Sequence, residues 1–169
     1  MKEDKNEEIC WNKIDLEKAN FILQQSEKCL NAALNNTDSL DKKSFAILSG
    51  SLFFASALII IILTKNFNLS DVLSLILLIA GFAGASILCL LSLQTKTIEL
   101  IGNKPLEMLK FKHSGYDYTY LVCCEAQSNE SKINKALEVN ILKGNKINQA
   151  LKLIQSTLII ALVLFIIPL

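Results

Sequence analysis

Residues 44–64 read SFAILSGSLFFASALIIIILT, and residues 72–95 read VLSLILLIAGFAGASILCLLSLQT. Neither stretch contains a charged residue, and each is long enough to cross the hydrocarbon core of a bilayer, which takes about 20 residues of helix. A core helix of a soluble protein would show a polar face, which the first stretch lacks. The short polar link KNFNLSD, residues 65–71, joins the two stretches. The sequence therefore predicts a transmembrane helical hairpin with spans at 44–64 and 72–95.

A third apolar run occupies residues 153–169, and its length is about the shortest that can cross a bilayer. Its length leaves open whether it spans completely or lies on the membrane surface. Together with the hairpin, it predicts an all-α membrane protein with a C-terminal third span and amphipathic cytoplasmic helices.

Two polar segments, residues 1–43 and 96–152, flank the hairpin, and each carries a helical pattern with steps of three and four residues. In the first segment, this stripe consists of Leu16, Ala19, Leu23, Ser26, Leu30 and Ala33. In the second, a long helix over 128–152 carries the stripe Ile133, Leu137, Asn140, Gly144, Ile147, Leu151 and Ile154, which continues into the third run. We expect both stripes to be packing faces.

The distribution of lysine predicts the topology. Seven lysines precede Ser44 and nine lie between Lys96 and Lys152, while the link between the first two spans holds only Lys65. The positive-inside rule then places the N-terminus and residues 96–152 in the cytoplasm, in a multi-pass arrangement.

Small residues cluster in the second span. Ala80 with Gly84, and Gly81 with Ala85, form two pairs spaced four residues apart that allow helix backbones to approach closely in lipid. The partner in this packing is the first span, another copy of the chain, or both, and we expect a homo-oligomer.

The composition excludes several functions. All 17 basic residues are lysine and 16 residues are acidic, which argues against a nucleic-acid partner. The five cysteines form no CxxC pair and the chain has one histidine, so we expect free thiols, no metal and no cofactor. No catalytic set is recognisable, which predicts that the chain is not an enzyme. The spans contain no ionisable side chain of the kind that ion-coupled transporters keep in the membrane.

The stretch most suited to a ligand lies between residues 96 and 127. Tyrosines that alternate in an extended segment would lie on one side, where a base can stack while nearby lysines meet its phosphate. Membrane-interface anchoring is the alternative role for such tyrosines. The candidate ligand-binding residues are Lys110, Lys112, His113, Tyr116, Tyr118 and Tyr120.

The layout resembles a known family. The chain has a polar N-terminal helix with Leu16, Glu17, Lys18, Ala19 and Asn20, then Asp41-Lys42-Lys43 before the first span, a hairpin, and the segment Asn140-Ile141-Leu142 with Lys146 before the last span. In these features it resembles the Pycsar transmembrane effectors and the related small two-transmembrane effector domains of bacterial nucleotide-signalling defence operons. The likeness covers nearly the whole chain and rests on layout and short motifs.

This resemblance implies an antiphage effector in the bacterial inner membrane. Such an effector responds to cyclic CMP or cyclic UMP, the diffusible product of a partner nucleotide cyclase, and then impairs membrane integrity so that the infected cell stops growing or dies. The cyclic nucleotide would be an activating ligand, and the effector itself would need no enzymatic activity. Two alternatives are a membrane-anchored interaction or scaffold protein and a holin-like pore former.

Overall fold

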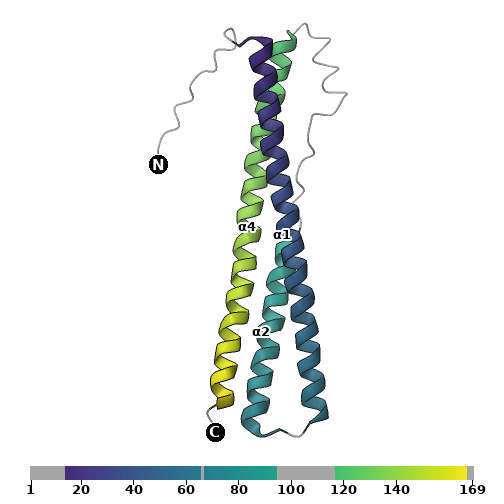
Figure 1. Ribbon diagram of the computed structural model, residues 1–169, viewed down its shortest axis with the longest axis vertical. Coiled ribbons are helices and arrows are strands. Elements are labelled where there is room, and N and C mark those ends of the chain that lie inside the picture. Colours follow the sequence, from purple (N-terminus) through teal and green to yellow (C-terminus); the bar gives the residue numbers. More distant parts are fainter. Residues whose placement is uncertain (1–13, 66, 95–116, 167–169) are drawn as a thin grey trace. The chain divides into compact units, whose positions relative to one another are not determined.

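Three long helices make up the part of the chain that the computed structural model describes, residues 14–65, 67–94 and 117–166 (Figure 1). They are α1 (Leu16–Thr64), α2 (Leu69–Leu93) and α4 (Tyr118–Ile166). No strand occurs within these described ranges. All three helices are long and apolar enough to cross a membrane. The fold class predicted from the sequence, an all-α membrane protein, is confirmed.

The helix α1 is longer than the span that the sequence predicts. Its 49 residues include the amphipathic stripe of the N-terminal segment and the whole of residues 44–64, with no break between them. The link after Thr64 is short, and α2 begins at Leu69 and ends at Leu93, close to the predicted limits of 72 and 95. The polar residues before Ser44 therefore continue the same helix that forms the first span.

The helix α4 also differs from the prediction, because it begins at Tyr118 rather than at residue 128. The predicted helix begins at residue 128 because residues 96–127 show no regular pattern and include Gly102, Pro105 and Gly115. Val122 and Cys123 nevertheless belong to the helix, where they are buried against Ala19 of α1. From there the helix continues through the third apolar run to Ile166.

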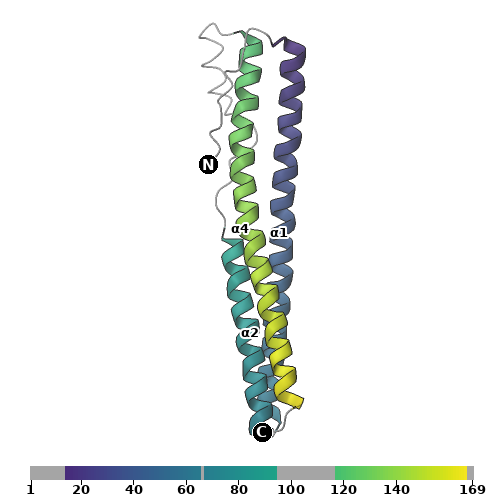
Figure 2. The ribbon, with the colours of Figure 1, turned by 90° about the vertical axis from the view of Figure 1, so that its left-hand side faces the viewer.

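The described residues form two compact units, and α1 and α4 contribute to both. We call residues 14–34 and 117–136 the two-helix unit, and residues 35–65, 67–94 and 137–166 the three-helix unit. Within each unit α1 and α4 run in the same direction, whereas α2 runs opposite to both in the three-helix unit (Figure 2).

In the two-helix unit a small core holds α1 against α4. Ala19, Val122 and Cys123 are buried, and Ile14 and Leu23 pack on them. The start of α1 is capped by Asp15, whose Oδ1 accepts a hydrogen bond of 2.8 Å from the backbone N–H of Lys18. This hydrogen bond lowers the pKa of the Asp15 carboxyl below its usual value, with a further contribution from the Lys18 side chain.

The three-helix unit has a core of small side chains and an apolar outer surface. Ala85, Cys89 and Ala150 form the core, with Ile47 and Ile154 among the side chains packed on it. Large apolar side chains face outward instead: Phe53 is 68% exposed, Ile159 65% and Phe165 62%. Soluble proteins rarely expose continuous apolar surface of this kind, so the outer surface of this unit is suited to lipid.

The small residues of α2 lie at the contact with α4. A Cβ atom added at Gly81 would come within 2.5 Å of the Thr157 side chain, and one added at Gly84 within 2.8 Å of a methyl group of Leu153. Ala85 is fully buried in the core, whereas Ala80 is exposed. The third span is thus a partner of this face, in addition to the candidates considered from the sequence.

Alanine substitutions at three glycines test this packing. Gly81→Ala should lower the free energy of unfolding by about 1–3 kcal/mol, because the short side chain of Thr157 cannot move away from the added methyl group. Gly84→Ala should cost less, since the terminal methyl of Leu153 can rotate aside. Gly50→Ala meets open space and should leave stability unchanged or raise it by up to about 1 kcal/mol. Unfolding of the micelle-bound protein by SDS measures the order of these three stabilities. Equal losses of stability in Gly50→Ala and Gly81→Ala would contradict the contact between Gly81 and Thr157.

Candidate functional site: a polar layer at one end of the three-helix unit

The ligand-binding residues proposed from the sequence fall in two groups. Lys110, Lys112, His113 and Tyr116 lie outside the described residues. Tyr118 and Tyr120 lie in the first turn of α4, with exposed fractions of 62% and 37%. Residues two positions apart in an α-helix point about 200° apart, so these two rings do not share a face. The prediction of an extended segment at Tyr118 and Tyr120 is therefore wrong.

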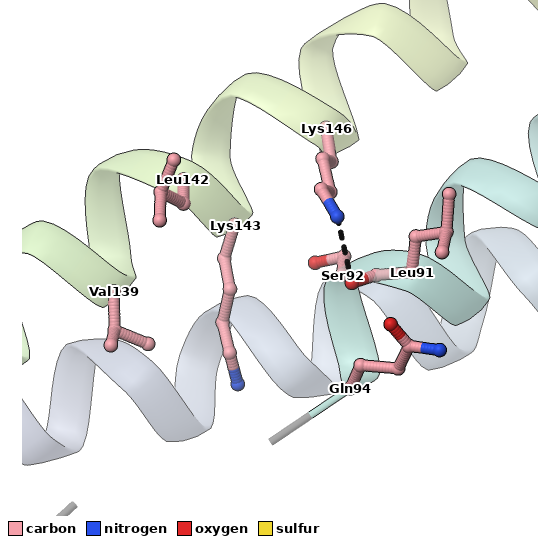
Figure 3. A pocket seen from close by; sticks show the side chains of 7 residues that line it. All are labelled: Leu91, Ser92, Gln94, Val139, Leu142, Lys143 and Lys146. Atoms are coloured by element: carbon pink, nitrogen blue, oxygen red, sulfur yellow. Dashed lines mark hydrogen bonds between the residues drawn. The ribbon is translucent and has the colours of Figure 1, made fainter. Parts of the chain in front are cut away.

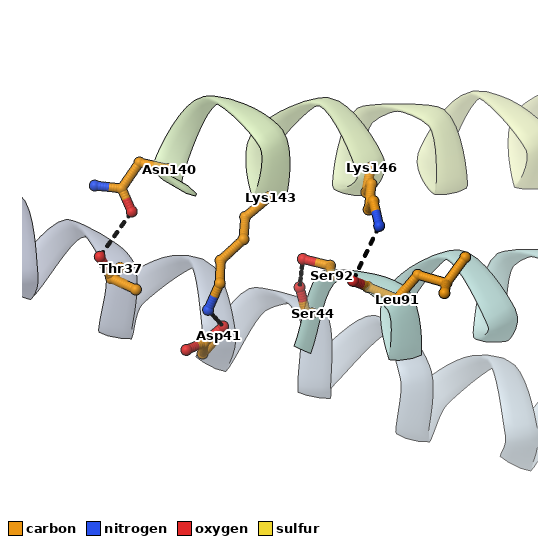
Figure 4. A network of polar contacts seen from close by, with 8 residues as sticks. All are labelled: Thr37, Asp41, Ser44, Leu91, Ser92, Asn140, Lys143 and Lys146. Carbon is orange, nitrogen blue, oxygen red and sulfur yellow. Dashed lines mark hydrogen bonds and ion pairs between the residues drawn. The ribbon is translucent and has the colours of Figure 1, made fainter. Parts of the chain in front are cut away.

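A different set of polar residues comes together at one end of the three-helix unit (Figure 4). We call this set the polar layer. It consists of Thr37, Asp41 and Ser44 of α1, the Leu91 carbonyl and Ser92 of α2, and Asn140, Lys143 and Lys146 of α4.

Two buried contacts join α1 to α4 in the polar layer. The Thr37 hydroxyl donates a hydrogen bond of 2.7 Å to Oδ1 of Asn140, and both residues are buried. One turn further along, Nζ of Lys143 forms an ion pair with Oδ1 of Asp41 at 2.5 Å. The Lys143 side chain is only 5% exposed, whereas that of Asp41 is 32% exposed. Asp41 thus compensates the charge of an ammonium group that is shielded from water, while the aspartate itself retains contact with solvent.

Two further contacts join α2 to the other helices. The hydroxyls of Ser44 and Ser92 lie 3.0 Å apart and share a hydrogen bond between α1 and α2. Nζ of Lys146 donates to the backbone carbonyl of Leu91 at 3.1 Å, which joins α4 to α2. Leu91 is in the last turn of α2, where carbonyl groups have no partner within the helix. Each of the three helices is therefore bonded to both others.

The polar layer lies where the apolar spans begin and end. Ser44 is the first residue of the apolar run of α1, Ser92 is next to the last residue of α2, and Lys146 precedes the third run of α4 by about two turns. Buried polar pairs of this kind fix which residues of two parallel helices face each other, because any other register leaves a charge or hydroxyl unpaired. We infer that the layer sets the register of the spans.

The buried face of α4 differs from the stripe that the sequence predicts. Asn140 and Ile147 are buried as expected, but Leu137 is 46% exposed and Leu151 is 41% exposed. The buried positions instead repeat every seven residues: Asn129, Ala136, Lys143, Ala150 and Thr157. A seven-residue repeat is typical of parallel coiled coils, and here small and polar residues occupy it. The stripe predicted from the sequence steps from Asn140 to Gly144 and Ile147, and it therefore leaves out Lys143.

Polar residues are also buried in the two-helix unit. Glu125, Asn129 and Lys132 of α4 are at most 8% exposed. Nδ2 of Asn129 donates a hydrogen bond of 3.1 Å to the Ser26 hydroxyl, while its Oδ1 accepts none from the described residues. Because these buried positions hold polar rather than apolar side chains, hydrophobic burial contributes less to the stability of the α1–α4 contact in this unit.

The thiols of the two-helix unit are not arranged for chemistry. Burial raises the pKa of the Cys123 thiol, and the neighbouring Cys124 raises it further, which disfavours the reactive thiolate. Cys29 is exposed. No group of three or more metal-ligating side chains occurs in the part of the chain that the structure describes.

Comparison with known proteins finds no matching family model, no matching curated protein and no matching solved structure. Fold and site geometry are therefore the observations that bear on function.

Unequal burial of the ion pair predicts unequal effects of removing its two members. Asp41→Ala should lower the free energy of unfolding by about 3 kcal/mol, because it leaves the Lys143 charge buried without a partner. Lys143→Met should cost about 1 kcal/mol or less, since Asp41 is partly solvated and the methionine fills similar space. In SDS titrations the double variant should resemble Lys143→Met. Equal losses for the two single variants would contradict the burial of Lys143.

Proposed function

We propose that this chain is an effector of the bacterial inner membrane that responds to a cyclic pyrimidine nucleotide and then impairs membrane integrity. The observation that carries the proposal is the polar layer, which joins all three membrane-spanning helices at the end where their apolar runs begin and end. A change in this layer alters the packing of the spans directly. The family resemblance supplies the class of ligand and the role in antiphage defence.

The buried polar pairs favour a switch between two arrangements over a gradual movement. Rotation of α4 by one residue, about 100°, would take Lys143 away from Asp41 and Asn140 away from Thr37. A buried lysine without a partner is costly, so intermediate positions are disfavoured and only arrangements that pair or solvate it are populated. The closed state has the contacts described above, and the open state exposes Lys143 to water.

Ligand binding in the cytoplasm can shift this equilibrium. The excess of lysine before Ser44 and in residues 96–152 orients these segments toward the cytoplasm, where the product of a cyclase is available. Both α1 and α4 contribute residues to the two-helix unit and to the three-helix unit without a helix break. A ligand that binds more tightly to one register of these helices changes the population of the open state.

The leak requires several copies of the chain. In the three-helix unit, small residues such as Gly81, Gly84 and Ala85 allow the spans of one chain to pack closely on each other. Opened units that assemble in the membrane can enclose such a path, so the active form is a homo-oligomer.

Membrane potential in cells tests the proposal. The chain is expressed in bacteria loaded with a potential-sensitive dye, with and without co-production of cyclic CMP or cyclic UMP. We expect depolarisation only when a cyclic pyrimidine nucleotide is present. Depolarisation without nucleotide would contradict the proposal in favour of a holin-like pore former, and no depolarisation under any condition would favour a scaffold.

Two lysine substitutions on α4 link the response to the polar layer. Asn140→Lys places a second charge among buried residues and should prevent the spans from adopting the closed packing. Depolarisation should then no longer depend on the nucleotide. Gly144→Lys adds the same charge to the same helix at a position with open space, and it should behave like the unchanged protein. Extraction with carbonate verifies that both variants insert. Identical responses of the two variants would contradict the proposal that the polar layer controls depolarisation.

A further inference from the structure

A cavity of about 380 Å³ opens beside the polar layer, between the end of α2 and the middle of α4 (Figure 3). Its lining combines the apolar side chains of Leu91, Val139 and Leu142 with the polar side chains of Ser92, Gln94 and two lysines. All these residues belong to the three-helix unit. We propose that this cavity binds the phosphate headgroup of an anionic phospholipid.

Lys146 supplies the charge for such a ligand. Lys143 is compensated by Asp41, so it contributes mainly its aliphatic stem to the lining. Lys146 has a different environment, because within the described part of the chain its ammonium group donates to the neutral carbonyl of Leu91 and to no carboxylate. An ammonium group has three donors, and this contact uses one. Two donors remain that can reach a phosphate oxygen at the cavity wall.

The position of the cavity along the helices fits a headgroup better than a soluble anion. Leu91 and Leu142 line the cavity and are also exposed, so apolar lining extends from the cavity to the outer surface of the unit. Gln94 lies at the end of the apolar run of α2, and Lys146 precedes the third apolar run by about two turns, which places the cavity near the depth where phosphates of a bilayer are found. A lipid can therefore place its phosphate at Lys146 and its acyl chains against leucine side chains.

Two further lysines lie at the same level of the three-helix unit, outside the lining of the cavity. Lys42 and Lys43 are exposed in the turn of α1 that also contains Asp41 and Ser44. Basic pockets between membrane helices on the cytoplasmic side bind anionic headgroups, and a lysine near an anionic membrane surface contributes about 1 kcal/mol to binding. A lipid bound in the cavity would stabilise the contact between α2 and α4. This proposal does not depend on the proposed response to a cyclic nucleotide.

Lipid retention by the purified protein tests the site. The full chain in detergent is mixed with phosphatidylglycerol or phosphatidylcholine of equal chain length, and bound lipid is counted by native mass spectrometry. We expect a preference for phosphatidylglycerol. Lys146→Gln should weaken its binding about fivefold, the value that follows from the loss of one lysine contact. Lys146→Arg should restore it, and the unchanged helical content of each variant is verified by circular dichroism.

Two further variants distinguish the cavity from general surface charge. Lys152→Gln removes an exposed lysine from the same helix outside the cavity and should leave binding unchanged. Leu142→Trp puts a larger side chain into the cavity and should reduce phosphatidylglycerol binding with every lysine retained. An equal loss in Lys152→Gln, no effect of Leu142→Trp, or no preference over phosphatidylcholine would overturn the proposal. Competition by millimolar inorganic phosphate or glycerol phosphate would instead assign the cavity to a free anion and overturn the lipid assignment.

Discussion

The ion pair between Lys143 and Asp41 is the constraint on which the arrangement of the three spans depends. A lysine that is 5% exposed at the edge of an apolar unit is stable only beside its counter-ion, and this fixes how α4 faces α1. The Thr37–Asn140 hydrogen bond lies one turn away on the same contact, and it has the same requirement for register. With α1 and α4 fixed, Ser44 and Lys146 can each reach the end of α2. The packing of the spans follows from a few polar contacts at one end.

The small residues between the spans explain why polar contacts contribute so much to the specificity of their packing. Within a bilayer, lipid tails are as apolar as leucine, so burying leucine between spans provides little driving force. The close packing of Thr157 and Leu153 on Gly81 and Gly84, and the directional bonds in the polar layer, replace the hydrophobic effect as the source of specificity. The large apolar side chains are left for the outer surface, as at Phe53 and Ile159. A lipid headgroup at Lys146 would add a contact from the solvent side of this same layer.

Much of the fold could be predicted from the sequence, because uncharged apolar runs of about 20 residues rarely occur outside membrane spans. The end of α1 at Thr64 and the hairpin follow from such patterns, and the small residues of α2 mark a packing face, whereas its contact with Thr157 of α4 was not among the predicted partners. The polar layer could not be predicted in the same way, since burial of Lys143 results from a tertiary partner rather than from its own polarity. The seven-residue repeat through Ala136, Lys143 and Ala150 is the one sequence feature that places Lys143 on the buried face. The start of α4 could not be predicted for a related reason, because its first turns are stabilised by tertiary contacts with Ala19 of α1.

A reversible crosslink across the polar layer tests most directly whether its opening controls the membrane. Thr37→Cys and Asn140→Cys, in a chain whose natural cysteines are replaced by alanine, place two thiols where the hydroxyl and amide now meet. The protein is reconstituted in liposomes that contain a fluorescent dye, and cyclic CMP or cyclic UMP is added. We predict no dye release while the disulfide holds α1 to α4, and release after reduction. Equal release from the oxidised and reduced protein would contradict the account, because the membrane would then leak without any change in the polar layer.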